Sequence, residues 1–263
     1  MSIHPHPVYT PIGPDATLWR YMSLEKFQRL LADRALFFCR ADKFSDIYEG
    51  SIPRREAEHR INESRRAADF YGQPFDEAAA LATIKDRAAF HQAFKYATIV
   101  NCWHINPNES DGMWRLYMDN NDGIAIQTTG ARITQAMEEA EEEIEMSKVR
   151  YIDYERDIWY HPENFPHRSY NMITPLIHKR AEFAHEQEFR LFHLIEEATR
   201  INEYWQPGQH GKNISVNLDT LVERVCLHPT MSEPARIHVQ NLMAATGLDK
   251  PVVFSQLSSR PYY

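Results

Sequence analysis

The sequence predicts an α+β fold, with a central mixed or antiparallel sheet flanked by helices. Apolar strand-like runs and amphipathic helical segments interleave along the chain, but they lack the strict strand–helix alternation of a doubly wound parallel sheet. Several connections between these segments are short, which also favours antiparallel neighbours. With 263 residues and 43% apolar composition, the chain can build one sizeable core, and we expect a single domain spanning residues 1–263.

The first part of the chain predicts an extended arm, a strand, a helix and a second strand, in that order. Residues 1–16 form the arm, and a short apolar and aromatic strand follows at 17–22. Ser23 is then a natural N-cap, because the apolar residues after it recur at helical spacing. A buried strand at 36–39 leads into a polar loop, 42–50, rich in turn-forming residues and charges.

A polar segment at residues 53–94 interrupts this pattern. It is rich in Arg, Glu and Ala and is broken at Gly72-Gln73-Pro74, so it predicts helices that form an insertion or a lid. The same periodicities predict the remaining elements: strands at 97–103, 123–128, 148–154, 187–195, 223–227 and 251–254, and helices at 113–117, from Arg132 through the acidic run 138–145, at 173–184 and at 232–245.

One segment concentrates ionisable groups in a sequence with the alternation of a half-buried strand. From residue 187 to 195 apolar side chains fall on one face, and Glu186, Glu188 and Arg190 fall on the other. Two close carboxylates raise the pKa of one of them, while a neighbouring Arg lowers it. Such tuning suits acid–base chemistry or the stabilisation of a cationic sugar. The alternative is a solvated strand face with an ordinary ion pair.

Arg20 lies between apolar and aromatic neighbours in Leu18-Trp19-Arg20-Tyr21. A buried guanidinium without an anion is energetically expensive, so Arg20 must find one. A partner carboxylate such as Glu188 would make the residue structural. A phosphate or carboxylate of a ligand, held by two hydrogen bonds, would make it functional.

Composition and motifs exclude several classes of protein. The formal net charge of -8 argues against a broad surface for nucleic acid or anionic membrane, although it leaves room for a local basic groove. The chain has no apolar window long enough for a transmembrane helix, and the first 14 residues do not resemble a signal peptide. We therefore expect a cytoplasmic protein without a membrane partner.

The sequence lacks the common motifs of nucleotide-binding and metal-dependent proteins. The chain contains no P-loop, GxGxxG, HExxH, GxSxG or EF-hand pattern. The three cysteines are widely spaced, which suits buried thiols better than a disulfide framework or a zinc knuckle. His104, His185 and His193 are near predicted strands, but their spacing fits no standard zinc site, so no metal is expected.

Several blocks of the sequence resemble an uncharacterised bacterial family, domain of unknown function 2971. The similarity spans most of the chain apart from the 53–94 segment, and it implies no settled activity. The blocks are Leu18-Trp19-Arg20-Tyr21-Met22-Ser23, residues 36–46 with Glu49-Gly50, Cys102-Trp103-His104, residues 113–117, residues 123–126, and Lys179-Arg180 with His185-Glu186-Gln187-Glu188-Phe189-Arg190.

The order of these blocks is also similar, more distantly, to that of ADP-ribosyltransferases. An early strand carries Arg20 after an apolar–aromatic pair, and Glu186-Gln187-Glu188 later runs into an apolar strand. The resemblance implies an ADP-ribosyltransferase-like sheet in which Arg20 grips a phosphate or ribose of NAD. Glu188 would stabilise the ribosyl oxocarbenium ion, and Glu186 would orient the acceptor. The Ser-Thr-Ser strand of the arginine-type enzymes is absent.

We also expect Tyr21 and Arg190 to belong to the NAD-binding residues around Arg20. Phe44 and Tyr48 of the 42–50 loop are further candidates, because aromatic rings among polar turn residues are more useful as a stacking surface for a ligand than as core. We expect Arg20 and Glu188 to point into one cleft that this loop borders. Alternatively, Phe44 and Tyr48 only anchor the loop.

Two functions of different classes remain open from the sequence. The first is an NAD-dependent ADP-ribosyltransferase or NAD glycohydrolase, acting as a bacterial toxin or phage-defence effector. It would use NAD as substrate, modify a protein or nucleic-acid acceptor, and have a cognate antitoxin or regulator as partner. The second is a non-catalytic binding or regulatory domain with a structural Arg/Glu cluster. The aromatic and basic residues Trp103, Trp114 and Arg115 would allow base stacking.

Overall fold

A mixed sheet forms the centre of the computed structural model, which describes residues 8–117, 122–159, 172–201, 203–261 and 263. Within these residues the sheet has nine strands, which pair antiparallel except for β10 with β11. The strands are β1 (Thr17–Ser23), β2 (Ala35–Arg40), β3 (Thr98–Ile105), β4 (Gly123–Thr129), β5 (Glu145–Lys148), β8 (Glu188–Leu194), β9 (Gly211–Ser215), β10 (Arg224–Leu227) and β11 (Val252–Phe254). The predicted α+β class with a mixed sheet is confirmed.

The sheet is forked at β3. One edge of β3 pairs with β8 along residues 98–104. The other edge is shared, because β1 pairs with it at residues 104–105 and β2 pairs with it at residues 99–100. Between these two short ladders, β1 and β2 diverge on either side of residues 101–103. This divergence, which we call the fork, leaves backbone groups of β3 available to side chains.

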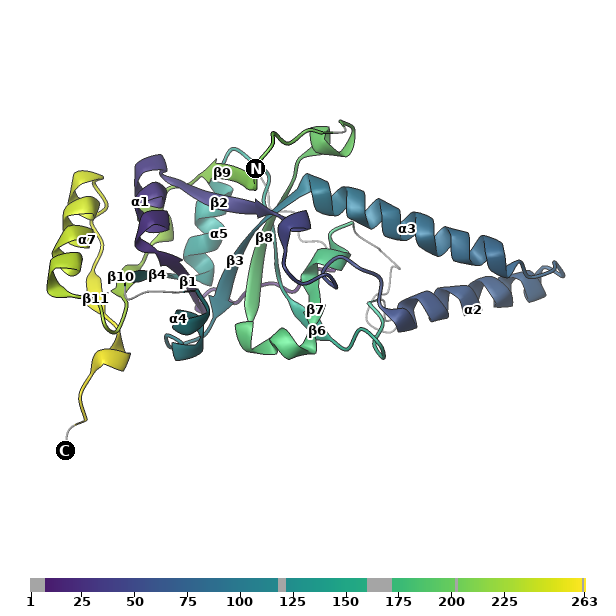
Figure 1. Cartoon of the computed structure of the whole chain (residues 1–263), viewed down its shortest axis with the longest axis horizontal. Helices are drawn as coiled ribbons and strands as arrows, with labels where there is room; N and C mark the ends of the chain where they lie inside the picture. Colours follow the sequence, from purple (N-terminus) through teal and green to yellow (C-terminus); the bar gives the residue numbers. More distant parts are fainter. Residues whose placement is uncertain (1–7, 118–121, 160–171, 202, 262) are drawn as a thin grey trace.

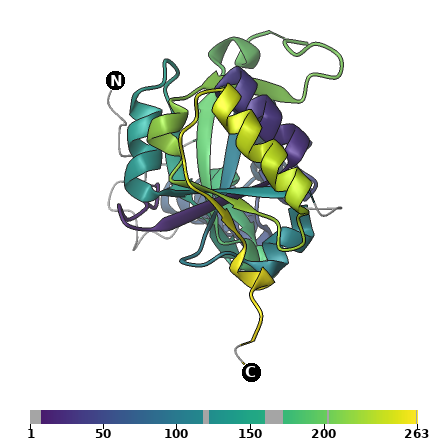
Figure 2. The ribbon, with the colours of Figure 1, turned by 90° about the vertical axis from the view of Figure 1, so that its left-hand side faces the viewer.

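Helices α1 and α7 lie side by side at one end of the molecule (Figure 2). As predicted, α1 (Leu24–Asp33) begins directly after Ser23, whose hydroxyl accepts a hydrogen bond from the amide of Lys26. Helix α7 (Glu233–Ala245) contacts α1 through Gln28 and His238, 3.1 Å apart. Apolar side chains of both helices and of α5 (Gly130–Glu138) pack against the sheet as the main core.

Helices α2 (Arg54–Phe70) and α3 (Glu77–Ala97) form a hairpin that projects from the body of the protein (Figure 1). They confirm that residues 53–94 are helical and broken near Gly72. Two further helices are short, α4 (Asp111–Tyr117) and α6 (Leu218–Leu221). No helix in the described part of the chain is both long and apolar enough to span a bilayer.

Three predicted elements differ from the structure. The helix expected to continue through 138–145 ends at Glu138, because burial of Ala140 and Ile144 turns the chain back toward the sheet while neighbouring like charges disfavour a helix. The strand expected at 148–154 is divided between β5 and β6 (Arg150–Ile152), and β6 pairs with β7 (His178–Arg180) in a small parallel sheet.

The third difference is the helix predicted at 173–184, which is wrong. The segment forms two 3₁₀ turns, Thr174–Ile177 and Ala181–Glu186, on either side of β7. The first turn contains a proline and is buried on every side, so it has no polar face for an amphipathic helix. This arrangement matters for the site, because it delivers Lys179 and Glu186 to the same place.

Candidate functional site

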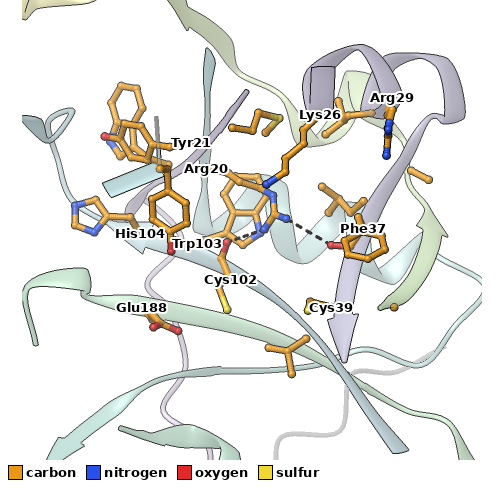
Figure 3. Close-up of a pocket in the computed structure, with 18 of the residues that line it drawn as sticks. Arg20, Tyr21, Lys26, Arg29, Phe37, Cys39, Cys102, Trp103, His104 and Glu188 are labelled. Carbon is orange, nitrogen blue, oxygen red and sulfur yellow. Dashed lines mark hydrogen bonds between the residues drawn. The ribbon is translucent and has the colours of Figure 1, made fainter. Parts of the chain in front are cut away.

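A cavity of about 720 Å³ opens at the fork of the sheet. Its size is within the range of about 300–1,000 Å³ that is usual for small-molecule sites. Its walls come mainly from β1, α1, β2 and β3 (Figure 3), and residues of α4, β8 and β9, together with Phe44 and Glu186, also line it. Among the lining side chains are Arg20, Tyr21, Lys26, Phe37, Phe44, Cys102, His104, Tyr117, Glu186 and Glu188.

Arg20 spans the fork. Its Nη1 donates to the carbonyl oxygen of Cys102 on β3 at 2.8 Å, and its Nη2 donates to that of Phe37 on β2 at 3.4 Å. Among the described residues it has no carboxylate partner, so the alternative in which Glu188 neutralises it is wrong. Burial lowers the pKa of the guanidinium, yet an arginine stays charged in proteins. Arg20 therefore presents an uncompensated positive charge to the cavity.

Glu188 has two cationic partners of its own. One carboxylate oxygen lies 2.5 Å from Lys179 Nζ, and the other lies 2.6 Å from Arg190 Nε. Glu188 and Arg190 are 5% and 1% exposed, so the alternative of a solvated strand face is wrong. Both lie on β8, where their spacing of two residues puts them on the same face.

Two further carboxylates complete a buried ionic cluster. Lys179 Nζ also contacts Glu186 at 2.7 Å and Glu49 at 3.5 Å. Arg190 Nη2 lies 2.7 Å from Glu49 without the alignment of a hydrogen bond, and its Nη1 donates to the carbonyl of Leu176. Three carboxylates thus face two cations, so the cluster carries one net negative charge when every group is ionised.

The two cavity-lining glutamates differ in their proton affinity. Burial, together with the adjoining Glu188 carboxylate, raises the pKa of Glu186 to about 7. Burial also opposes the ionisation of Glu188, but the charges of Arg190 and Lys179 outweigh it and hold the pKa of Glu188 well below its usual range. At neutral pH Glu188 is a fixed anion, whereas Glu186 exchanges a proton. Such divergence is typical of paired catalytic carboxyl groups.

The backbone between the two glutamates is unusual. Gln187 adopts a left-handed conformation with φ of 41°, which is uncommon for a residue other than glycine. It ends the 3₁₀ turn and starts β8, and its carbonyl accepts a hydrogen bond from the amide of Ile105. This conformation brings Glu186 and Glu188 to one lysine from different elements. Residues in such conformations cluster at functional sites.

The 42–50 loop only partly follows the prediction. Phe44 lines the cavity, and its ring lies 5.0 Å from the Arg190 guanidinium. Tyr48 instead packs edge-on against Tyr154, with ring centroids 5.3 Å apart, and Arg180 lies over its ring. Tyr48 therefore anchors the loop and gives no wall to this cavity.

The remaining predicted residues have distinct positions. Tyr21 lines the cavity, and its hydroxyl accepts a hydrogen bond from the amide of Ser110. Arg190 lies behind Glu188 and orients it, so it has no direct place in the cavity wall. Lys179 and Glu49 are not among the predicted site residues, although Lys179, two residues after the apolar pair Leu176-Ile177, was a usable signal.

His104 is a neutral part of the cavity wall. Its Nδ1 lies 2.6 Å from the carbonyl oxygen of Glu186, and burial lowers the pKa of its ring. His185 and His193 are elsewhere, near the carbonyls of Glu182 and Glu143. Over the described residues, no group of three or more His, Cys, Asp or Glu side chains is arranged to hold a metal ion.

The fold and site define an α+β protein with a charge-polarised cavity in a forked mixed sheet. The model of the family described as protein of unknown function (DUF2971) matches residues 113–191. The resemblance drawn from the sequence is thereby confirmed over that segment, which includes β4 and most of α4 and β8. No curated protein matches this chain.

Two solved structures are similar to the chain as a whole. One is Thermus sp. 2.9 DarT in complex with ADP-ribosylated ssDNA, with a TM-score of 0.37 and 8% sequence identity, covering 95% of this chain and 98% of that chain. The other is Thermus sp. 2.9 DarT in complex with carba-NAD+, with a TM-score of 0.35 and 9% identity, covering 97% and 98%. Overlaps at these TM-scores are too loose to define a shared fold.

Proposed function

We propose that the protein consumes NAD as substrate, transferring ADP-ribose to an acceptor or to water. One observation carries this proposal: Arg20 and the Glu186–Glu188 pair line the same cavity with opposite charges. NAD has the matching pattern, because its nicotinamide ring is cationic and its diphosphate is anionic. Arg20 suits the diphosphate, since guanidinium groups bind phosphate oxygens with two hydrogen bonds.

The chemistry follows from the fixed charge of Glu188. The bond between the ribose C1 and the nicotinamide nitrogen breaks, and its electron pair leaves with nicotinamide, which becomes neutral. The positive charge passes to the ribose as an oxocarbenium ion. A buried anion that already has its hydrogen-bond partners stabilises that charge without reorganisation. Lys179 and Arg190 keep Glu188 ionised and immobile.

Glu186 supplies the second function of the pair. The acceptor nucleophile, a hydroxyl, an amine or water, attacks C1 and must lose a proton. A carboxylate with a pKa near 7 is suited to take it, because about half of it is available as a base at neutral pH and it still releases the proton readily. Tyr117 and His104 also line the cavity, and His104 Nδ1 lies 2.6 Å from the carbonyl oxygen of Glu186, so in this proposal both frame the approach of the acceptor.

The biological roles that accord with this activity are a toxin or a phage-defence effector. Uncontrolled consumption of NAD, or modification of a macromolecule, arrests growth, so such a protein would need a cognate antitoxin or regulator. The acceptor is a protein or a nucleic acid in this proposal. Growth of bacteria that express the wild-type chain, with intracellular NAD measured in parallel, tests the role. Unchanged growth and NAD levels at confirmed expression would refute it.

Purified protein tests the activity directly. We expect wild-type protein to release nicotinamide from NAD, alone or with whole-cell protein, RNA or single-stranded DNA as acceptor. Labelled ADP-ribose would show which acceptor fraction is modified, and free ADP-ribose would show hydrolysis. Absence of nicotinamide release under all of these conditions would refute the proposal.

A second candidate function has one specific observation in its favour. Glu188 is nearly inaccessible and has ion pairs at both of its oxygens, as expected of a structural carboxylate in a non-catalytic binding domain. In that case the cavity would bind an anionic ligand through Arg20 without cleaving it. Binding of NAD with no release of nicotinamide would support this alternative.

The pH dependence of transfer should depend on Glu186. Because this group accepts a proton only as a carboxylate, we expect kcat/KM to rise with pH, to reach half its maximum near pH 7 and to level off about one pH unit higher. Glu186→Gln should lower transfer to the acceptor and remove this rise. The matched control is Glu182→Gln, an exposed residue of the same 3₁₀ turn, which should keep the wild-type profile. An unaltered profile in Glu186→Gln would show that another group takes the proton.

A further inference from the structure

Lys26 is a charged residue of the cavity wall that the proposed mechanism does not use. It lies in the first turn of α1, and its side chain extends from the helix toward Arg20 (Figure 3). Within the described part of the chain, neither of these two cations has a carboxylate partner. Arg29, one turn further along α1, differs because it pairs with Glu25 at 2.5 Å.

Lys26 is exposed to solvent, and it lies in a turn of the helix that does not favour a positive charge. The first turn of a helix carries the positive end of the helix dipole, where anions stabilise and cations destabilise. Arg20 adds a second positive charge on the same side. Both side chains line the same cavity. An anion bound between them would be attracted by both charges.

We propose that Lys26 is a phosphate-binding residue that acts together with Arg20, and that the two cations hold the diphosphate of a nucleotide. The inference rests on the proposed function, whose substrate contains a diphosphate, and adds to it a binding residue and a substrate class. Arginine offers a planar pair of donors, whereas lysine offers a point charge on a flexible stem. The two can therefore bind neighbouring phosphate groups, with the Ser23-capped end of α1 reinforcing the positive field.

The wall beside the two cations indicates what the diphosphate is attached to. Phe37 on β2 lines the cavity and is 45% exposed, which is unusual for a phenylalanine in a strand of the central sheet. Its own carbonyl accepts hydrogen bonds from Arg20 and Asn101, so this residue lies beside Arg20 in the cavity wall. An exposed aromatic ring adjacent to a phosphate site is a stacking surface for a nucleobase. The class of ligand is thus a nucleoside diphosphate or its ester.

Calorimetric titration with ADP and AMP tests this inference. We expect the wild-type protein to bind ADP at least about tenfold more tightly than AMP, because only ADP can engage both cations. Lys26→Met, which keeps the apolar stem, should weaken ADP binding by about tenfold or more and leave AMP binding nearly unchanged. Lys26→Arg should retain most of the preference. The matched control is Lys85→Met, an exposed lysine on α3, which removes the same charge away from the cavity.

The outcomes separate this inference from the proposed function, because binding of ADP does not require cleavage of NAD. Equal ADP affinity in wild type and Lys26→Met, or a wild type without preference for ADP over AMP, would overturn the role of Lys26. If that happened while wild type released nicotinamide from NAD, the proposed function would stand. A wild type that binds ADP through Lys26 but never cleaves NAD would instead refute the function and leave the inference intact. Circular-dichroism melting checks that each variant is folded.

Discussion

Glu188→Gln should reduce NAD cleavage by about a hundredfold or more. Glutamine keeps the size of the side chain but removes the anion that would face the ribosyl cation, and its NH2 group replaces one of the two oxygens that accept from Lys179 and Arg190. Loss of one preorganised electrostatic group costs about 3 kcal/mol in the barrier, which corresponds to this factor. The rate of nicotinamide release at saturating NAD measures the effect, and Glu182→Gln, an exposed change of charge nearby, should stay close to wild type.

The same substitution is also expected to lower the melting temperature. Lys179 and Arg190 would keep only Glu186 and Glu49 as buried anions, so the cluster would lose a central charge. The kinetic assay must therefore be made well below the transition, with ADP-ribose binding as a check on the cavity. A variant that keeps ADP-ribose affinity and loses cleavage supports a catalytic anion. Wild-type cleavage in folded Glu188→Gln would contradict that role.

Arg190→Met should cause the largest loss of stability of any single change in the cluster, about 3–5 kcal/mol. Arg190 is 1% exposed, and its removal leaves Glu188 and Glu49 buried with Lys179 as their remaining ion-pair partner among the described residues. Urea unfolding at neutral pH measures the loss, because the midpoint and the slope of the transition together give the free energy of unfolding. The control is Arg200→Met, whose ion pair with Glu196 is solvent-exposed and should contribute no more than about 1 kcal/mol.

The pH dependence of this loss has a definite sign. The pKa of Glu188 is depressed in the folded protein, so its ionised form stabilises the fold above the unfolded pKa of about 4.3. That contribution disappears as the pH falls, because folded and unfolded states then both bind the proton. The difference in the free energy of unfolding between wild type and Arg190→Met should therefore become smaller below about pH 4.5. If Arg190→Met lowers the free energy of unfolding at neutral pH as little as the control Arg200→Met does, the cluster tolerates an unpaired carboxylate.

The sequence predicted correctly those elements whose formation depends on interactions between neighbouring residues. The cap at Ser23 and the helical spacing after it located α1, and alternation located β8 with its two charged residues on one face. The breaker at Gly72-Gln73-Pro74 separated α2 from α3. In each case the signal and its cause lie within a few neighbouring residues.

The partners of these residues could not be predicted in the same way. Glu49 and Lys179 reach the cluster from a loop and a short strand that periodicity does not connect with β8. The shape of 173–186 depends on burial of its first turn from every side, which overrides the helical spacing of its apolar residues. Tyr48 was predicted to border the cavity because it is an aromatic residue in a polar loop. Its ring instead packs against Tyr154, from a distant part of the chain.

The forked sheet links the width of the cavity to the side chain of Arg20. β1 and β2 are joined to β3 only at residues 104–105 and 99–100, whereas β8 pairs along 98–104. Across the gap, Arg20 on β1 is hydrogen-bonded to carbonyls of both β3 and β2, so it ties the two arms of the fork together. An anion that draws the guanidinium toward itself competes with these carbonyls for the same donors. Occupancy of the cavity and the separation of its two walls are thereby coupled through one residue.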